Sequence, residues 1–163
     1  MTTPIRVVKK EIRILGLDFC SPKTVTGAVV RGGDFLDGIV SFPNSMELDD
    51  REVALRIIGT RFYPELRAVM IHDPLFRSRP KIVEKVTKLP VMRVSNVRPL
   101  HRGFRMVQLA RGRLWVQTGL SRETLEKIVS VTWTFGRLPE PARVAHLLSR
   151  TRVLPRPSMY DKN

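Results

Sequence analysis

The chain has 163 residues, which is enough for one domain with a hydrophobic core of its own. Hydrophobic residues make up 42% of it, which excludes a disordered chain, and the single cysteine, Cys20, excludes an internal disulfide and favours the cytoplasm. No apolar run approaches the length of a membrane span and the first residues lack the apolar core of a signal peptide, so no membrane partner is expected.

Charge is the strongest feature of the composition. Lysine and arginine number 29 against 15 acidic residues, for a net charge of +14 and a pI near 11.2. Residues 91–157 alone hold thirteen basic residues and three acidic ones. This surplus predicts a polyanionic partner, and the planar guanidinium suits the phosphates of a nucleic acid. The alternative is a generic basic surface of a heat-adapted protein, although ion-pair networks in such proteins use both signs of charge.

The first predicted strand covers residues 11–20. Ile14 and Gly16 share one of its faces, and Leu15 and Leu17 share the other. Because a strand with apolar residues on both faces is buried on both, this one is expected at the centre of a sheet.

A carboxylate, Asp18, lies near the end of this strand, where a buried strand should carry none. One interpretation is an aspartate that begins a turn into residues 21–22. The other is the first ligand of a metal-dependent site that acts on phosphodiesters.

The remaining elements follow in chain order. Residues 23–31 and 35–42 are rich in strand-forming residues and are joined by a turn at residues 32–34, which completes a three-strand antiparallel meander. The patterns then predict a helix at residues 48–62, a strand at 66–71, a helix at 78–88 and a strand at 90–94. A loop or irregular strand at residues 95–113 and a short strand at 114–118 follow, and helices at 121–132 and 139–150 end the series.

This order of elements predicts an α/β protein with a ribonuclease H-like three-layer fold. Its mixed sheet would consist of the antiparallel meander followed by parallel strands, since parallel strands need the helical crossovers that the pattern supplies, and helices would flank the sheet. Residues 1–150 are expected to form a single domain, and residues 151–163 a basic, proline-containing tail.

In such a fold, carboxylates from the first strand, the first helix and the end of the fourth strand hold divalent ions. The candidate ligands are therefore Asp18, Asp49 or Glu52, and Asp73. Oxygen ligands suit Mg²⁺. For Asp49 and Glu52 a capping box at the start of the helix is the competing interpretation.

Three blocks of sequence resemble a known family. They are RILGLD at Arg13–Asp18, RGGDFLDG at residues 31–38 and GRLPEPARVAHLL at residues 136–148. Together they resemble a small archaeal family of uncharacterised proteins that is distantly similar to endonuclease V, which cuts nucleic acid near deaminated bases. The resemblance runs from about residue 10 to residue 150, is most specific in the last block, and implies a ribonuclease H-like fold and a nuclease ancestry.

The resemblance also implies a degraded metal site. Asp18 matches the family's aspartate on the first strand, but Phe19 stands where the family tends to have a second acid. At the fourth strand the family has Asp-Gly, where this chain has His72 followed by Asp73. A shift of one residue turns a side chain to the opposite face unless a bulge restores it, and histidine binds softer metals than Mg²⁺.

Two hypotheses follow. The first is a nucleic-acid-binding protein without a cofactor, with RNA favoured over DNA as the ligand. A stable place in a ribonucleoprotein such as the ribosome fits this hypothesis. The arginines expected to bind phosphates are Arg93, Arg98, Arg102, Arg105, Arg111, Arg113, Arg152 and Arg156.

The second hypothesis is a Mg²⁺-dependent endonuclease with Asp18, Asp49 and Asp73 as catalytic residues. We favour the binding protein, because a site of this kind loses most activity when a ligand is missing. The specificity for sequence or structure and the oligomeric state stay open.

The remaining histidines and aromatic residues have weaker interpretations. His101 lies in the arginine-rich segment, where it fits contacts to phosphate or bases as well as catalysis. His146 is expected in the last helix, beside its apolar stripe, as a residue at the boundary between core and surface. Trp115, Trp133 and Phe135 fit either the core or stacking on bases.

Overall fold

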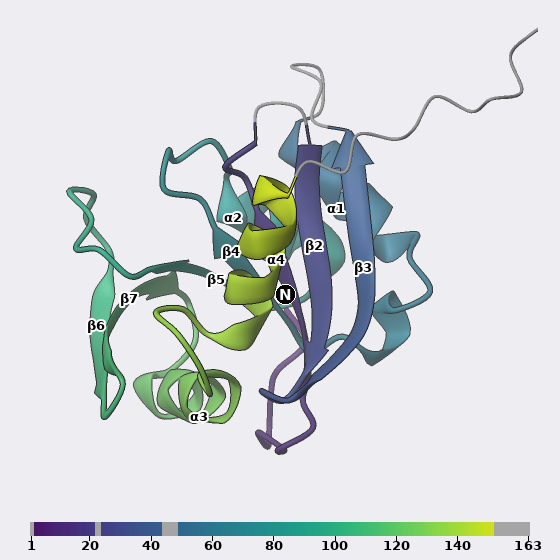
Figure 1. Ribbon diagram of the computed structural model, residues 1–163. Helices are drawn as coiled ribbons and strands as arrows, with labels where there is room; N and C mark the ends of the chain where they lie inside the picture. The colour runs from purple at the N-terminus through teal and green to yellow at the C-terminus, as the bar shows by residue number, and fades with distance from the viewer. Residues whose placement is uncertain (1, 22–23, 44–48, 152–163) are drawn as a thin grey trace, which may run out of the picture.

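The computed structural model describes residues 2–21, 24–43 and 49–151 (Figure 1). Its centre is a seven-stranded mixed sheet with the strand order β3-β2-β1-β4-β5-β7-β6. The strands are β1 (Arg13–Asp18), β2 (Thr24–Arg31), β3 (Phe35–Pro43), β4 (Ala68–His72), β5 (Val91–Ser95), β6 (Arg105–Leu109) and β7 (Gly112–Thr118). The helices are α1 (Asp50–Ile58), α2 (Pro80–Thr87), α3 (Arg122–Thr132) and α4 (Glu140–Arg150), with one 3₁₀ turn, η1 (Tyr63–Glu65).

The pairing of the strands confirms the meander and the parallel strands after it. β1 pairs antiparallel with β2, which pairs antiparallel with β3, while β1, β4 and β5 are parallel neighbours. β7 pairs antiparallel with both β5 and β6. The helices α1 and α2 supply the crossovers that connect the meander to β4 and β4 to β5.

The largest difference from the sequence-based expectation is β6, which lies inside the segment expected to be a loop or an irregular strand. Of its five residues only Val107 is buried, so the strand has almost none of the alternating apolar pattern that marks a strand in a sequence. β6 is the edge strand of the sheet, where one paired neighbour is enough to hold it.

The helices cover the two faces of the sheet, in agreement with the expected three layers. Figure 1 shows α4 in front of the sheet and α1 and α2 behind it. On one face, here called the α1/α2 face, Leu15 and Leu17 of β1 pack with Val53 and Ile57 of α1. Burial on both sides makes β1 the central strand that its sequence predicts.

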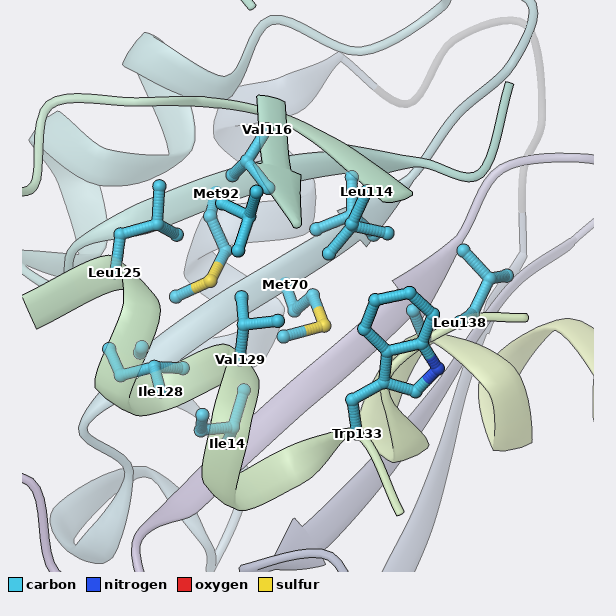
Figure 2. Close-up of a cluster of buried hydrophobic side chains, with 14 of the residues drawn as sticks. Ile14, Met70, Met92, Leu114, Val116, Leu125, Ile128, Val129, Trp133 and Leu138 are labelled. Atoms are coloured by element: carbon cyan, nitrogen blue, oxygen red, sulfur yellow. The ribbon is translucent and has the colours of Figure 1, made fainter. Parts of the chain in front are cut away.

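The other face, here called the α3/α4 face, holds the second core. Figure 2 shows Met70 and Met92 from neighbouring strands packed against Ile128 of α3, with Trp133 closing the cluster toward α4. Ile14 of β1 belongs to this cluster, so the alternation read from residues 14–17 is confirmed.

Helix α4 lies unusually close to β1. A β-carbon at Gly16 would collide with the backbone carbonyl of Pro141, in the first turn of α4. Glycine at this position is therefore a condition for the contact between β1 and α4, because any other side chain would push the helix away from the sheet.

No helix of the described ranges is both long and apolar enough to cross a membrane. Arg152 and Arg156, which the sequence placed among the phosphate ligands, lie outside the described residues.

Candidate functional site

Asp18 lies at the end of β1 and is completely buried. Its Oδ2 is 2.7 Å from Nδ1 of His72 and 2.8 Å from Nδ1 of His146. Its Oδ1 accepts a hydrogen bond of 2.9 Å from the backbone N–H of Cys20. Because a carboxylate only accepts hydrogen bonds, both imidazoles turn a protonated Nδ1 toward it.

The sheet and α4 bring these residues together. Asp18 and His72 are aligned in the parallel register of β1 and β4, so their side chains leave the same face side by side. His146 reaches the same point from α4, which Gly16 allows to approach. Cys20 is two residues after Asp18, and its Sγ lies 3.7 Å from Nδ1 of His72.

The hydrogen bonds keep Asp18 ionised in spite of its burial. Burial alone would raise the pKa of this carboxyl group, but hydrogen bonds from His72, from the Cys20 backbone and from α4 outweigh it and hold the pKa far below its usual range. The thiol of Cys20 shows the opposite effect: burial, followed by the negative charge of Asp18, raises its pKa to about 12.

The four side chains form a set of potential metal ligands. One ligand atom from each of Asp18, Cys20, His72 and His146 lies within 4.8 Å of the others. Two nitrogens, a sulfur and an oxygen do not fit Mg²⁺, which prefers oxygen ligands, so this set departs from the Mg²⁺ site expected in the fold. We name these residues the Asp-Cys-His-His cluster.

Asp73, the carboxylate expected beside Asp18, lies on the other face of the sheet. It follows His72 directly, and side chains alternate between faces along a strand. Its Oδ2 accepts hydrogen bonds from the backbone N–H of Ser78 at 2.7 Å and from its hydroxyl at 2.6 Å. The guanidinium of Arg93 is 3.6 Å away. Asp73 thus stabilises the turn that leads into α2.

Asp49 and Glu52 are both exposed at the start of α1. Asp49 is the N-cap of the helix, and its Oδ1 accepts a hydrogen bond of 2.9 Å from the backbone N–H of Glu52, so the capping interpretation of Asp49 is confirmed. Within the described ranges, no group of three potential metal ligands includes Asp49, Glu52 or Asp73.

The carboxylate of α1 that approaches Asp73 is Asp50, which the sequence did not single out. Its Oδ2 accepts a hydrogen bond of 3.0 Å from the backbone N–H of Arg79. Burial, together with the nearby charge of Asp73, raises its pKa. Asp50 and Asp73 therefore form a second pair of neighbouring carboxylates, both of which accept hydrogen bonds from the segment that leads into α2.

The arginines predicted to bind phosphate divide into two groups. Arg93 is only 7% exposed; its guanidinium donates to the backbone carbonyl of Ser78 and stacks 4.7 Å from the ring of Phe76. Its guanidinium group is therefore engaged in contacts inside the protein. Arg105 is half-buried and donates to the carbonyls of Thr118 and Leu120. Of the predicted phosphate-binding arginines that the structure describes, the exposed ones are Arg98, Arg102, Arg111 and Arg113.

Three of these exposed arginines line one hollow of about 540 Å³ between the β5–β6 loop and the β6–β7 hairpin. We name it the arginine groove, after its charged and aromatic lining of Arg98, His101, Arg102, Phe104, Arg113 and Trp115. A second hollow of about 580 Å³ shares Arg98, His101 and Phe104 with it and extends to Phe76 and Arg93. The two hollows are therefore neighbours that share part of the β5–β6 loop.

Aromatic rings gather where the hollows meet. The rings of Phe76 and His101 lie 3.7 Å apart between centroids, and Phe104 meets Phe76 edge-on at 6.0 Å. Phe76 has a φ of 53°, a left-handed conformation that is uncommon for a residue with a side chain. Trp115 lines the arginine groove, whereas Trp133 is a core residue.

The sequence analysis missed Cys20 and Phe76 as site residues, and it placed His146 only beside the apolar stripe of the last helix. For Cys20 a pattern was available, since residues 18 and 20 share a face of an extended strand. For His146 no local pattern exists, because 128 residues separate it from Asp18. Phe76 lies in a turn, where no periodicity indicates the direction of a side chain.

No family model matches the chain. It is 30% identical over 184 residues to a UPF0215 protein of Methanothermobacter thermautotrophicus, covering 88% of this chain and 89% of that protein. It is also 30% identical to a UPF0215 protein of Methanosarcina acetivorans, covering 87% of this chain and 91% of that protein.

Among solved structures, the crystal structure of a protein of unknown function from Archaeoglobus fulgidus shares the fold. The TM-score is 0.68 at 20% identity, over 86% of this chain and 97% of that one. The family assignment comes from the sequence relatives. Because the chain is 30% identical to these UPF0215 proteins over most of its length, it belongs to the archaeal UPF0215 family.

Proposed function

We propose that the protein binds single-stranded nucleic acid, RNA in preference to DNA, in the arginine groove. The observation that supports this most is the combination of three exposed guanidinium groups with the rings of His101, Phe104 and Trp115 in one hollow. Proteins that hold single strands without reading a sequence combine positive charge along the backbone with aromatic platforms for the bases.

The apolar residues around the groove support bases as the ligand, beyond a polyanion alone. Leu100 is fully exposed, and Val97 and Met106 are 67% and 42% exposed. A purely electrostatic site for phosphates has no use for such side chains, whereas unstacked bases cover apolar surface. Unpaired bases are more common in RNA than in DNA, which is why RNA is the proposed ligand.

The scaffold in this proposal is a ribonuclease H-like domain of endonuclease V ancestry whose carboxylate site has been lost. The antiparallel meander followed by parallel strands supports it, as do the resemblances noted in the sequence. Around Asp18 the neighbouring ligands are histidines and a cysteine, and Asp73 faces the opposite side of the sheet. A stable place in a ribonucleoprotein such as the ribosome fits this basic, binding-only protein.

Fluorescence anisotropy with labelled single-stranded RNA and DNA tests the proposal. The logarithm of the affinity should fall linearly with the logarithm of salt concentration, with a slope of about 0.7 per phosphate contact. The double variant Arg98→Ala/Arg102→Ala should bind more weakly and reduce that slope by about 1.4.

The matched control is Arg56→Ala/Arg67→Ala, which removes the same charge. Arg56 lies in the last turn of α1 and Arg67 just before β4, at the end of the parallel strands opposite to the loop that follows β5. An equal loss of affinity in both double variants would mean that net charge alone attracts RNA, and the groove would be rejected.

The nuclease alternative is tested with the same preparation. Incubation of structured RNA and inosine-containing strands with Mg²⁺ or Mn²⁺ should leave them intact. Cleavage that depends on metal and disappears in Asp18→Asn would replace the binding proposal with an endonuclease. Co-sedimentation of the protein with ribosomes in a cell extract tests whether it is a stable component of that ribonucleoprotein.

A further inference from the structure

We propose that the Asp-Cys-His-His cluster is a site for a transition-metal ion of the Zn²⁺ class, with Asp18, Cys20, His72 and His146 as its four ligands. This site lies on the α3/α4 face and is independent of RNA binding in the arginine groove. Nitrogen, sulfur and oxygen donors of this kind are the ligands of zinc in proteins.

The spacing of the donors suits one ion at their centre. Ligand bonds of about 2.0–2.3 Å in a tetrahedron place neighbouring donors about 3.3–3.8 Å apart. Nδ1 of His72 and Sγ of Cys20 are already 3.7 Å apart, and the two Nδ1–Oδ2 distances of 2.7 and 2.8 Å need to lengthen by less than a bond length. With all four donor atoms within 4.8 Å of one another, side-chain adjustment suffices.

The cluster occupies a place where an ion is both protected and reachable. Asp18 is completely buried and the side chain of His72 is 9% exposed, while that of His146 is 28% exposed and Cys20 is half-buried. An ion can therefore enter beside α4 and then be held by ligands from the interior.

The protons balance simply. In the metal-free protein each imidazole donates its Nδ1–H to Asp18; on binding, that proton moves to Nε2, which leaves a lone pair on Nδ1 for the ion. The thiol of Cys20 binds as a thiolate and releases one proton to the solvent. Four protein ligands close the coordination sphere, which is typical of a structural site.

The ion would join segments that are distant in the sequence. Asp18 ends β1, Cys20 follows it, His72 ends β4 and His146 belongs to α4. The hydrogen bonds among Asp18, His72 and His146 already make this junction. A metal would replace them with coordinate bonds, so bound ion should raise the melting temperature.

The test uses the untagged full-length chain, stripped with a chelator and titrated with Co²⁺ and then with Zn²⁺. We expect one ion per chain, visible bands typical of tetrahedral Co²⁺, and a thiolate-to-metal band in the near ultraviolet that Zn²⁺ abolishes. Because Cys20 is the only cysteine in the sequence, the thiolate band in the wild-type protein assigns this ligand by itself.

Variants divide the ligands from the rest of the chain. Cys20→Ser should lose the thiolate band, and His146→Gln should weaken Zn²⁺ binding by more than about tenfold, since even second-layer partners of a metal site are worth ~10–100-fold. His101→Gln is the matched control, because His101 is the third histidine of the chain and lies outside the cluster. This variant should bind Zn²⁺ as tightly as the wild type does. Circular dichroism in chelator verifies that each variant is folded.

The proposal is overturned if the wild-type protein binds no Co²⁺ or binds it without a thiolate band. It is equally overturned by one ion shared between two chains, or by binding that His101→Gln removes and His146→Gln leaves intact. All of these outcomes can be read from metal binding alone, whether or not RNA binds in the groove.

Discussion

Asp18 and His72 are partners in the parallel register of β1 and β4, and the carboxylate of the one lies 2.7 Å from the imidazole of the other. The pair occupies the ends of two neighbouring strands in the interior of the sheet. His146 of α4 joins this pair, with its Nδ1 at 2.8 Å from the same carboxylate oxygen.

This pair should contribute to stability. Asp18→Asn keeps the size of the side chain but removes the charge that the two histidines and the Cys20 backbone stabilise, so the free energy of unfolding should fall by about 1–3 kcal/mol. Urea denaturation in the presence of chelator measures it. Asp49→Asn is the control, because asparagine caps a helix as well as aspartate does and should leave the unfolding midpoint almost unchanged.

The contact between β1 and α4 should be intolerant of a larger residue. In Gly16→Ala the new methyl group meets the backbone of Pro141, which cannot move aside as a side chain would. We expect a loss of about 1–3 kcal/mol or more in the free energy of unfolding. Gly119→Ala, where a β-carbon has open space, should change stability by less than about 0.5 kcal/mol. Equal effects of the two substitutions would contradict the close approach of α4.

Arg93 and Arg102 should separate stability from binding. Arg93→Gln leaves Asp73 buried without its cation, and the free energy of unfolding should fall by about 3 kcal/mol or more. Arg102→Ala removes an exposed side chain of the arginine groove, so stability should hold while RNA affinity falls. Thermal denaturation and anisotropy on both variants check this. The reverse pattern would show that Arg93 binds the ligand.

The acidic side of the stability profile should depend on Asp37. Its carboxylate binds Arg13 at 2.8 Å and Arg31 at 3.0 Å, and the hydrogen bond from Arg13 holds its pKa below the usual range. A carboxyl group whose pKa is lower in the folded state stabilises the protein above its unfolded pKa of about 4, and this contribution disappears as the pH falls through the folded pKa.

Asp37→Asn should therefore lower the free energy of unfolding by about 1 kcal/mol at pH 7, because the ion pairs are partly exposed, and by less and less as the pH falls below about 4. Urea denaturation at a series of pH values measures the difference. Asp34→Asn, at an exposed position in the same β2–β3 turn region, is the control for removing one carboxylate and should change the free energy of unfolding at pH 7 by less than about 0.5 kcal/mol. If the difference in the free energy of unfolding between wild type and Asp37→Asn grew at acidic pH, the stabilising role of the ionised Asp37 carboxylate would be refuted.

The sequence alone determined most of the elements, because their patterns are local. The two apolar faces at residues 14–17 predicted the central strand, and Asp49, three residues before Glu52, predicted the cap of α1. The same reasoning predicted only a loop or an irregular strand where β6 lies, because this edge strand has a single buried residue, and it did not predict the contribution of β6 to the arginine groove.

The tertiary structure alone decided which residues meet. Local patterns could not decide whether Asp73 or His72 would face Asp18. The register of β4 against β1 aligned His72 with it, and Asp73, one residue later, contacts Ser78 and Arg93 instead. The tertiary structure also decided that Arg93 is buried, because β5 lies between β4 and β7. In the same way His146 reaches Asp18 only because Gly16 allows α4 to approach β1. The physical reason is that a side-chain pattern specifies a segment's own faces, whereas packing between segments distant in the chain determines what each face contacts.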